Sequence, residues 1–162
     1  MEQAIVGDLD VRGGLCRVDV RGGLAEVLRA VTAAGVRPEA VDLLPGGTVL
    51  LAVAAADAPA IAHLPGAGRP EPVVRVVLAG AGLRGDPVLV PTFCEVLCRA
   101  GAVPVSVSAE SGRIGAVVGA DVAPRVIAGL REAFELSPTS VFADSADSAV
   151  GALGAVGALG AA

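Results

Sequence analysis

The stretch that decides the fold runs from Val73 to Phe142 and reads VVRVVLAGAGLRGDPVLVPTFCEVLCRAGAVPVSVSAESGRIGAVVGADVAPRVIAGLREAFELSPTSVF. It opens with a valine-rich run of strand length, Val73–Ala79, which is followed by a Gly/Asp/Pro loop at Gly80–Pro87. Apolar residues then recur at i, i+3 and i+4, which predicts a helix over Val90–Ala100. Gly101 is expected to end this helix as its C′ residue.

The second half of the stretch predicts four more elements. They are strands at Val103–Ser108 and Ile114–Val118 joined by a hairpin turn at Glu110–Arg113, a helix at Val122–Phe134 with Asp121 as its N-cap, and a last strand at Ser140–Ala143. The order is strand, helix, strand, strand, helix, strand. This order predicts a small sheet covered by helices on one face.

The N-terminal part of the chain repeats this plan. Its expected elements are strands at Ala4–Asp8 and Leu15–Val20 with a turn at Arg12–Gly14 between them, a helix at Leu24–Ala34, strands at Glu39–Leu44 and Thr48–Ala54, and a short helix at Asp57–His63. The segment Ala34-Gly35-Val36-Arg37-Pro38 overlays Ala100-Gly101-Ala102-Val103-Pro104 at an offset of 66 residues. Self-similarity at a fixed offset indicates two copies of one unit.

The stretch also resembles the second ACT unit in the regulatory region of aspartate kinases, the enzymes that open the lysine, threonine and methionine pathway. The residues that carry the resemblance are Gly80–Pro87 in the glycine-rich loop, Phe93, Glu95 and Leu97 in the helix, Ser108 and Ile114 in the hairpin, and Glu132–Leu136 in the closing helix. The N-terminal AIVGDLDVRGGLCRVDV resembles the start of the separately made small (beta) subunit of some aspartate kinases. The resemblance covers about residues 3–144.

The resemblance implies an α+β fold of tandem ACT domains, which are ferredoxin-like βαββαβ units with antiparallel sheets, pairing side by side. We expect a first unit over residues 1–64, a linker over 65–72, a second unit over 73–144 and a flexible low-complexity tail over 145–162. The Pro/Gly-rich segment Gly66–Pro70 is a poor fourth strand because proline lacks a ladder donor. Either that edge of the first sheet stays bare, or the strand near Ala4–Val6 fills it out of sequence order.

Both glycine loops precede helix starts, where backbone N–H groups can receive a carboxylate. ACT units of the family bind effector amino acids such as lysine or threonine against these loops. Carried over by position, the expected effector-binding residues are Asp19, Arg21, Gly22, Thr48, Arg84, Gly85, Asp86, Val103 and Ser108. The opposing interpretation is that these loops are only turns, and the sequence does not decide between the two.

Several positions depart from the family pattern and weaken the expectation of the usual effectors. The asparagine that opens the strand after the first helix is Arg37 in one copy and Val103 in the other, and a Gln-Asn pair is replaced by Leu43-Leu44. Lost amides remove hydrogen bonds worth about 0.5–1.5 kcal/mol each. Two hypotheses therefore stand, an amino-acid-sensing regulatory subunit and a docking module that no longer binds a ligand.

Composition excludes several other classes of protein. The net charge of −5 disfavours a nucleic-acid partner, and no apolar run reaches the roughly 20 residues of a membrane span. We expect a cytoplasmic homodimer, or a partner of an aspartate kinase catalytic chain, without cofactor or metal. No P-loop, nucleophile–base pair or magnesium-binding acidic cluster predicts catalysis.

The cysteines and the acidic residues of the second copy have plain structural interpretations. Cys94 and Cys98 lie at i, i+4 and are expected to be small core residues rather than metal ligands. Glu110, Glu132 and Glu135 are expected to be solvated surface residues. The three cysteines are too few for a disulfide framework.

Overall fold

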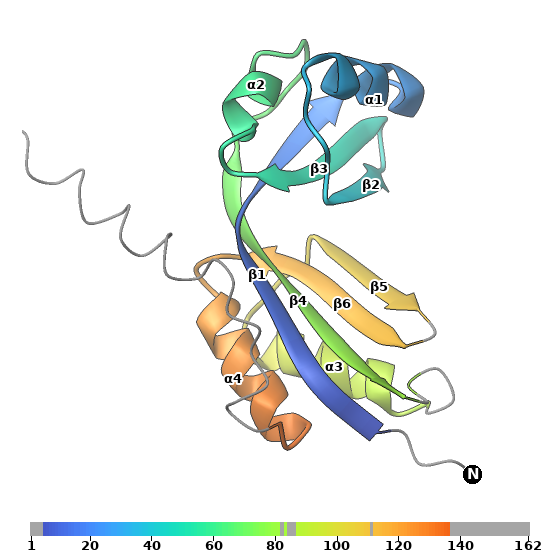
Figure 1. Ribbon diagram of the computed structural model, residues 1–162, viewed down its shortest axis with the longest axis vertical. Coiled ribbons are helices and arrows are strands. Elements are labelled where there is room, and N and C mark those ends of the chain that lie inside the picture. Colours follow the sequence, from blue (N-terminus) through green and yellow to red (C-terminus); the bar gives the residue numbers. More distant parts are fainter. Residues whose placement is uncertain (1–4, 82, 84–86, 111, 137–162) are drawn as a thin grey trace, which may run out of the picture. The chain divides into compact units, whose positions relative to one another are not determined.

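A computed structural model describes residues 5–81, 83, 87–110 and 112–136. The elements are β1 (Ile5–Arg21), α1 (Leu24–Ala33), β2 (Ala40–Leu44), β3 (Thr48–Ala54), α2 (Ala58–Ala62), β4 (Glu71–Ala81), α3 (Leu89–Arg99), β5 (Ser106–Glu110), β6 (Arg113–Gly119) and α4 (Ala123–Ala133) (Figure 1). The fold is α+β, as expected from the sequence. The predicted strand at Ser140–Ala143 and the tail lie outside the described residues.

The chain divides into two compact units, which we name by their place in the sequence. The inserted unit is Leu15–Val73, and the split unit combines Met1–Gly14 with Val74–Ala162. The expected division placed residues 5–14 in the first unit, whereas here they belong with the second. The reason is that Leu9, with no exposed surface, packs in one core with Val76 and Leu78.

The predicted pair of N-terminal strands is one continuous strand, β1, and the turn expected at Arg12–Gly14 does not form. Both halves of β1 have a partner strand, β4 for the first half and β3 for the second. Gly14 takes a φ of +68° inside the strand, a conformation that glycine adopts without steric cost. Gly13 and Gly14 therefore lie within β1, where the chain passes from the split unit to the inserted unit.

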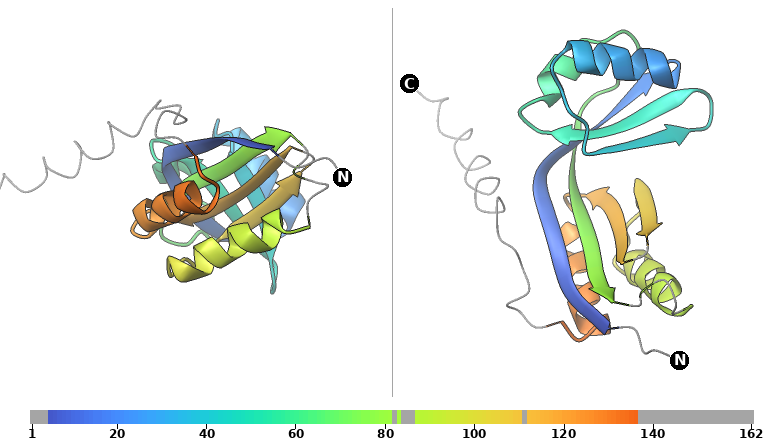
Figure 2. Two further views of the ribbon diagram at one scale, coloured as in Figure 1. Left: turned by 90° about the horizontal axis from the view of Figure 1, so that it is seen from below. Right: turned by 45° about the vertical axis from the view of Figure 1, so that its right-hand side comes forward.

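In the split unit the strand order is β1-β4-β6-β5, with α3 and α4 on one face of the sheet (Figures 1 and 2). Phe93, Val96 and Leu97 of α3 are buried at the predicted spacing. They pack with Val126 and Leu130 of α4 and with apolar residues of β4 and β6. The expected helix at Val122–Phe134 is confirmed as α4, but Val122 rather than Asp121 is its N-cap, and no side chain caps it.

In the inserted unit the strand order is β2-β3-β1, with α1 and α2 over one face (Figure 2). The register pairs Arg21 of β1 with Thr48 of β3 and pairs Leu44 of β2 with the same Thr48. The core is rich in valine, and its buried residues are Val18, Val20, Val27, Val31, Val36, Val49, Leu51, Val53, Ala58 and Ile61.

The fourth position of the inserted sheet is neither bare nor filled by the N-terminus. Residues 66–68 occupy it and pair with the end of β1 through an antiparallel bridge between Val20 and Ala67. The glycine-rich segment forms no regular strand, as expected, but the bridge holds it beside β1, because the two glycines permit close backbone approach. A Cβ at Gly66 would lie 2.7 Å from the carbonyl oxygen of Arg21. The predicted linker is therefore part of the unit.

The cysteine prediction holds only in part. Cys94 is half-buried on α3, but Cys98 is exposed and so is not a core residue. The core face of α3 is occupied by Phe93, Val96 and Leu97 instead. Glu110, Glu132 and Glu135 are exposed, as expected.

Candidate functional site

Three of the predicted effector-binding residues line one cavity of the inserted unit. This cavity of about 380 Å³, which we call the β1-end cavity, is lined by Asp19, Arg21, Thr48, Gly66, Ala67 and Gly68. The last residues of β1, the first residue of β3 and the segment after α2 each contribute to it. The strand register explains the grouping, since Arg21 and Thr48 are direct neighbours across the sheet.

Backbone hydrogen bonds fix the glycine wall of the β1-end cavity. The N–H of Gly68 donates to the carbonyl of Asp19 at 2.7 Å, and the N–H of Arg21 donates to the carbonyl of Gly66 at 2.9 Å. Gly66 has a φ of +78°, so a side chain there would be strained as well as too close to β1. The glycines thus allow the segment to pack against the backbone of β1.

A forked ion pair holds the carboxylate of the cavity. Arg17 donates from Nε to Asp19 Oδ1 at 2.7 Å and from Nη2 to Asp19 Oδ2 at 2.6 Å. Arg17, Asp19 and Arg21 alternate with the buried Val18 and Val20, so all three side chains lie on the same face of β1. The hydrogen bonds to Asp19 raise the pKa of the Arg17 guanidinium.

The predicted amide donor of the loop is already in use. The N–H of Gly22 donates to the carbonyl of Gly47 at 2.9 Å, which ties the loop to the β2–β3 turn. Gly22 does not line the β1-end cavity. With Arg21 and Glu26 it lines a smaller neighbouring cavity of about 140 Å³ beside the start of α1.

The second predicted site is not brought together in the described residues. Arg84, Gly85 and Asp86 lie outside the described residues. Val103 is 87% exposed before β5, and Ser108 is exposed on β5 opposite Gly115. Whether these residues form a site therefore stays a prediction.

Sequence reasoning missed Arg17, Gly66, Ala67 and Gly68. A signal for Arg17 was present, because Arg17, Asp19 and Arg21 follow one another at every second residue of a predicted strand and must share a face. The role of residues 66–68 had no local signal. Their pairing with β1 joins residues more than 40 positions apart and depends on the folded unit.

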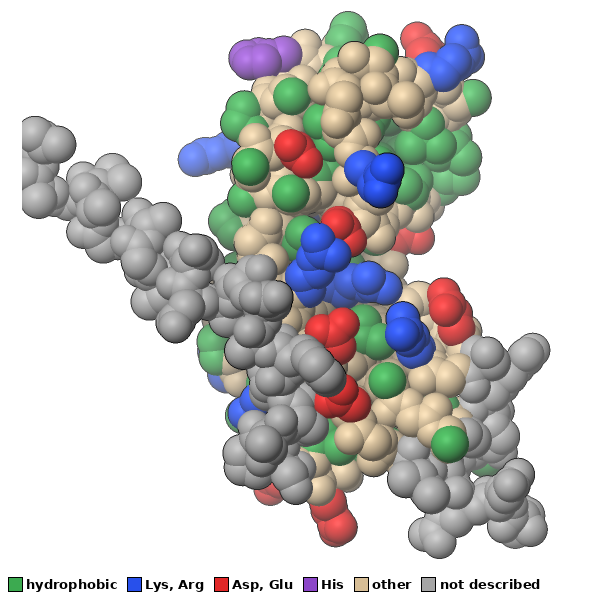
Figure 3. All heavy atoms as spheres, viewed as in Figure 1, with side chains coloured by type: hydrophobic (Ala, Val, Ile, Leu, Met, Phe, Trp, Pro, Cys, Tyr) green, Lys and Arg blue, Asp and Glu red, His purple; other side chains and the backbone are tan. Residues whose placement is uncertain are grey.

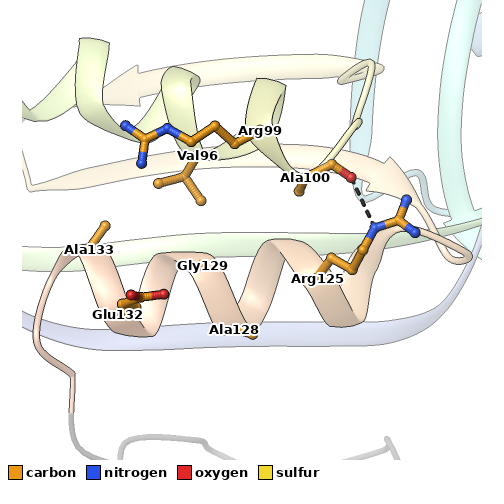
Figure 4. A pocket seen from close by; sticks show the side chains of 8 residues that line it. All are labelled: Val96, Arg99, Ala100, Arg125, Ala128, Gly129, Glu132 and Ala133. Atoms are coloured by element: carbon orange, nitrogen blue, oxygen red, sulfur yellow. Dashed lines mark hydrogen bonds between the residues drawn. The ribbon is translucent and has the colours of Figure 1, made fainter.

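A groove of about 530 Å³ lies between α3 and α4 of the split unit (Figure 4). Small residues form its floor, and Gly129 brings the helices close, since a Cβ there would lie 2.9 Å from Val96 Cγ1. Both arginines along it are engaged: Arg125 Nε donates to the carbonyl of Ala100 at 3.1 Å, and Arg99 Nη2 donates to Glu95 Oε2 at 3.0 Å. Glu132 also lines the groove, so its charged side chains are of both signs.

The described residues provide little support for other site classes. They contain no group of three or more His, Cys, Asp or Glu side chains that could hold a metal ion. None of the helices in the described ranges is both long enough and apolar enough to cross a membrane. Acidic and basic side chains are interspersed with apolar ones on the face shown in Figure 3. A mixed surface of this kind does not resemble the basic stripe that nucleic-acid binding requires.

Neither the scan of protein-family models nor the search of curated proteins gives a match. Solved structures do match. The aspartokinase alpha and beta subunits align with a TM-score of 0.68 at 18% identity, covering 81% of this chain and 99% of that chain. The regulatory subunit of aspartate kinase from Thermus thermophilus, in its ligand-free form, aligns with a TM-score of 0.66 at 21% identity over 81% and 99% of the two chains. The regulatory subunit of aspartate kinase from Thermus flavus aligns with a TM-score of 0.66 at 16% identity, covering 80% of this chain and 99% of that chain.

These matches span nearly the whole length of each regulatory subunit, and they agree with the two repeated units described above. The chain therefore has the fold of the regulatory subunits of aspartate kinase.

Proposed function

We propose that this chain is a non-catalytic regulatory subunit that binds a small amino acid and controls a partner kinase. The observation that carries the proposal is the β1-end cavity, which joins Asp19, Arg21 and Thr48 on the fold of an aspartate kinase regulatory subunit. A guanidinium and a hydroxyl against a backbone wall suit a small ligand with a carboxylate, because both groups can donate hydrogen bonds to it.

Control of the kinase would be a population shift. An effector can bias an equilibrium only if it binds one arrangement more tightly than another. Backbone pairing already holds the three segments of the β1-end cavity together, so the effector would act by preferring one arrangement of units or of chains over another. The catalytic chain of an aspartate kinase is the partner we propose, since a solved relative is described as alpha and beta subunits together.

The two units are proposed to be ACT units that pair through their outer strands. β2 and β5 end the strand order, and both carry exposed apolar side chains, with Val41 39%, Leu43 61% and Val107 43% exposed. An edge strand with apolar side chains is suited to pairing with another chain. A homodimer would cover these edges, and light scattering at tens of micromolar would test it, since a monomer would contradict the pairing.

A thermal-shift series tests the sensing role. The full-length chain is heated with L-lysine, L-threonine, L-methionine, L-aspartate or L-glutamate at millimolar concentration, with D-alanine as a non-effector control. An effector at 100 times its Kd stabilises the folded chain by about 2.7 kcal/mol, which raises the Tm measurably. No shift with any amino acid would contradict ligand sensing.

The second candidate function is a docking module without a ligand. The observation that favours it is the Gly22 N–H, which donates to Gly47 and so cannot receive an effector carboxylate. Co-purification of the chain with an aspartate kinase catalytic chain, together with the absence of any amino-acid response, would support this function over sensing.

A further inference from the structure

The effector class of the β1-end cavity can be inferred from how its charges are distributed, and this inference rests on the function proposed above. Two charged side chains line the cavity, Asp19 and Arg21. The question is which of them is available to a ligand.

Asp19 is largely committed to its neighbour. Both of its carboxylate oxygens accept hydrogen bonds from Arg17, at 2.7 and 2.6 Å, in the forked geometry that makes an Arg–carboxylate pair strong. The side chains are only 26% and 34% exposed, so water weakens the pair less than at an open surface. A ligand ammonium would have to compete with a guanidinium that is already aligned, and the charge of Asp19 is already neutralised.

Arg21 is in the opposite situation. Its backbone N–H is held by Gly66, so its position on the strand is fixed, whereas its exposed side chain forms no ion pair within the described residues. Glu26, which lines the smaller cavity next to Arg21, is not bonded to it either. A guanidinium has five donors and no acceptor, so it can bind only a ligand group that accepts.

The remaining groups of the cavity add donors and space. Thr48 lies directly across the sheet from Arg21, and its hydroxyl can donate to a carboxylate that Arg21 binds. The absence of side chains at Gly66 and Gly68 lets this segment lie against Asp19 and Arg21 of β1, which fixes the wall of the cavity. We propose that the β1-end cavity selects an amino acid with an acidic side chain, whose second carboxylate is bound by Arg21 and Thr48.

A basic effector would be rejected by the same arrangement. The ammonium of a lysine side chain would meet the unpaired Arg21 and find the opposite charge of Asp19 occupied by Arg17. Threonine has no side-chain carboxylate and offers Arg21 only its α-carboxylate. The predicted order of affinity is therefore L-aspartate or L-glutamate first, L-threonine next and L-lysine last.

Isothermal titration of the full-length chain with L-aspartate, L-glutamate, succinate, L-threonine and L-lysine tests the proposal. Arg21→Gln is expected to weaken binding of the acidic amino acid about tenfold or more, because it removes a charge-assisted hydrogen bond. Arg21→Lys keeps the positive charge but loses the paired donors of the guanidinium, so its affinity should lie between those of the unsubstituted chain and Arg21→Gln. Arg29→Gln is the matched control, since Arg29 Nε donates to the Ala25 carbonyl of its own helix and Arg29 lines neither cavity, and it should leave the affinity unchanged.

A substitution in the Arg17–Asp19 ion pair tests whether Asp19 is unavailable to a ligand. Arg17→Gln frees Asp19, so the preference for L-aspartate over L-lysine should shrink about tenfold or more. Melting of each variant without ligand verifies that it folds.

Tighter binding of lysine or threonine than of the acidic amino acids, unaffected by Arg21→Gln, would overturn this inference and leave the proposed function in place. Succinate binding as tightly as L-aspartate would overturn the assignment to an amino acid. Binding of no compound would overturn the proposed function itself.

Discussion

The inserted unit and the split unit repeat the same order of elements but complete their sheets differently. β2 at Ala40–Leu44 and β5 at Ser106–Glu110 lie 66 residues apart at both ends. The helices before them end in the same way. Gly35 and Gly101 have φ values of +75° and +73°, and in each case the next residue's N–H returns to a carbonyl five positions earlier. This is the hydrogen-bond pattern of a Schellman motif.

The differences lie at the fourth strand and the second helix. The split unit uses residues 5–14 of β1 and an 11-residue α4, whereas the inserted unit uses residues 66–68 and a five-residue α2. Longer elements bury more apolar surface, and the split core holds Phe93 and four leucines where the inserted core is mostly valine. The comparison indicates that the unit with the candidate site is the less heavily packed one, which suits a region that responds to a ligand.

The largest loss of stability is expected from a substitution of Leu9. Its effect shows whether residues 5–14 belong to the split unit or, as in two sequential units, to the unit that follows them in the chain. Leu9→Ala should cost about 2–5 kcal/mol, because Leu9 has no exposed surface and packs against Val76 and Leu78. Hydrogen exchange should show the loss of protection in β4 and β6 rather than in β3. Val11→Ala, at a partly buried position of the same strand, is the control and should cost less. Loss of protection confined to β3 would contradict the division of the chain.

The next effect tests the bridge that holds residues 66–68 of the inserted unit beside β1. Gly66→Ala should destabilise by about 2 kcal/mol or more, since it combines a φ of +78° with a Cβ 2.7 Å from the Arg21 carbonyl. Gly46→Ala is the matched variant, because Gly46 has a φ of +84° but nothing within 4 Å of the added atom. It should cost only the conformational part, about 1 kcal/mol. Equal losses in urea denaturation would show that residues 66–68 are not pressed against β1.

Most elements of both units could be predicted from the sequence, because each has a local cause. Period-3.6 apolar spacing marked α1 and α3, and Pro45-Gly46-Gly47 marked the β2–β3 turn. The joining of residues 5–14 to the split unit could not be predicted, since an apolar strand suits either sheet equally well. The same limit applies to the site: Asp19, Arg21 and Thr48 were expected, but their glycine wall depends on a pairing between distant segments.

Thiol reactivity should follow the burial found in the two units. Cys98 on α3 is exposed, whereas Cys16 on β1 is packed against the inserted core, and burial raises the pKa of its thiol. A raised pKa lowers the fraction of the reactive thiolate at neutral pH. Iodoacetamide labelling followed by mass spectrometry should modify Cys98 first and Cys16 last. In urea the order should disappear, and labelling of Cys16 before Cys98 in the folded chain would contradict its packing.

The smallest effects are expected at two ion pairs, Arg17–Asp19 in the inserted unit and Arg99–Glu95 in the split unit, and they test whether Arg17 occupies the Asp19 carboxylate. Double-mutant cycles should give a coupling energy of about 1 kcal/mol for Arg17–Asp19, whose side chains form a forked pair and are 26% and 34% exposed. The coupling energy of Arg99–Glu95 should be no more than about 0.5 kcal/mol, because this pair has one bond at 3.0 Å and its side chains are 72% and 64% exposed. The matched variants are Arg17→Gln with Asp19→Asn, and Arg99→Gln with Glu95→Gln. Repeating the cycles in 1 M salt should reduce the exposed pair more, because screening acts mainly on solvated charges. Equal coupling energies that vanish together in salt would mean that Asp19 is as free as a surface carboxylate, and the cavity would then present a usable negative charge beside Arg21.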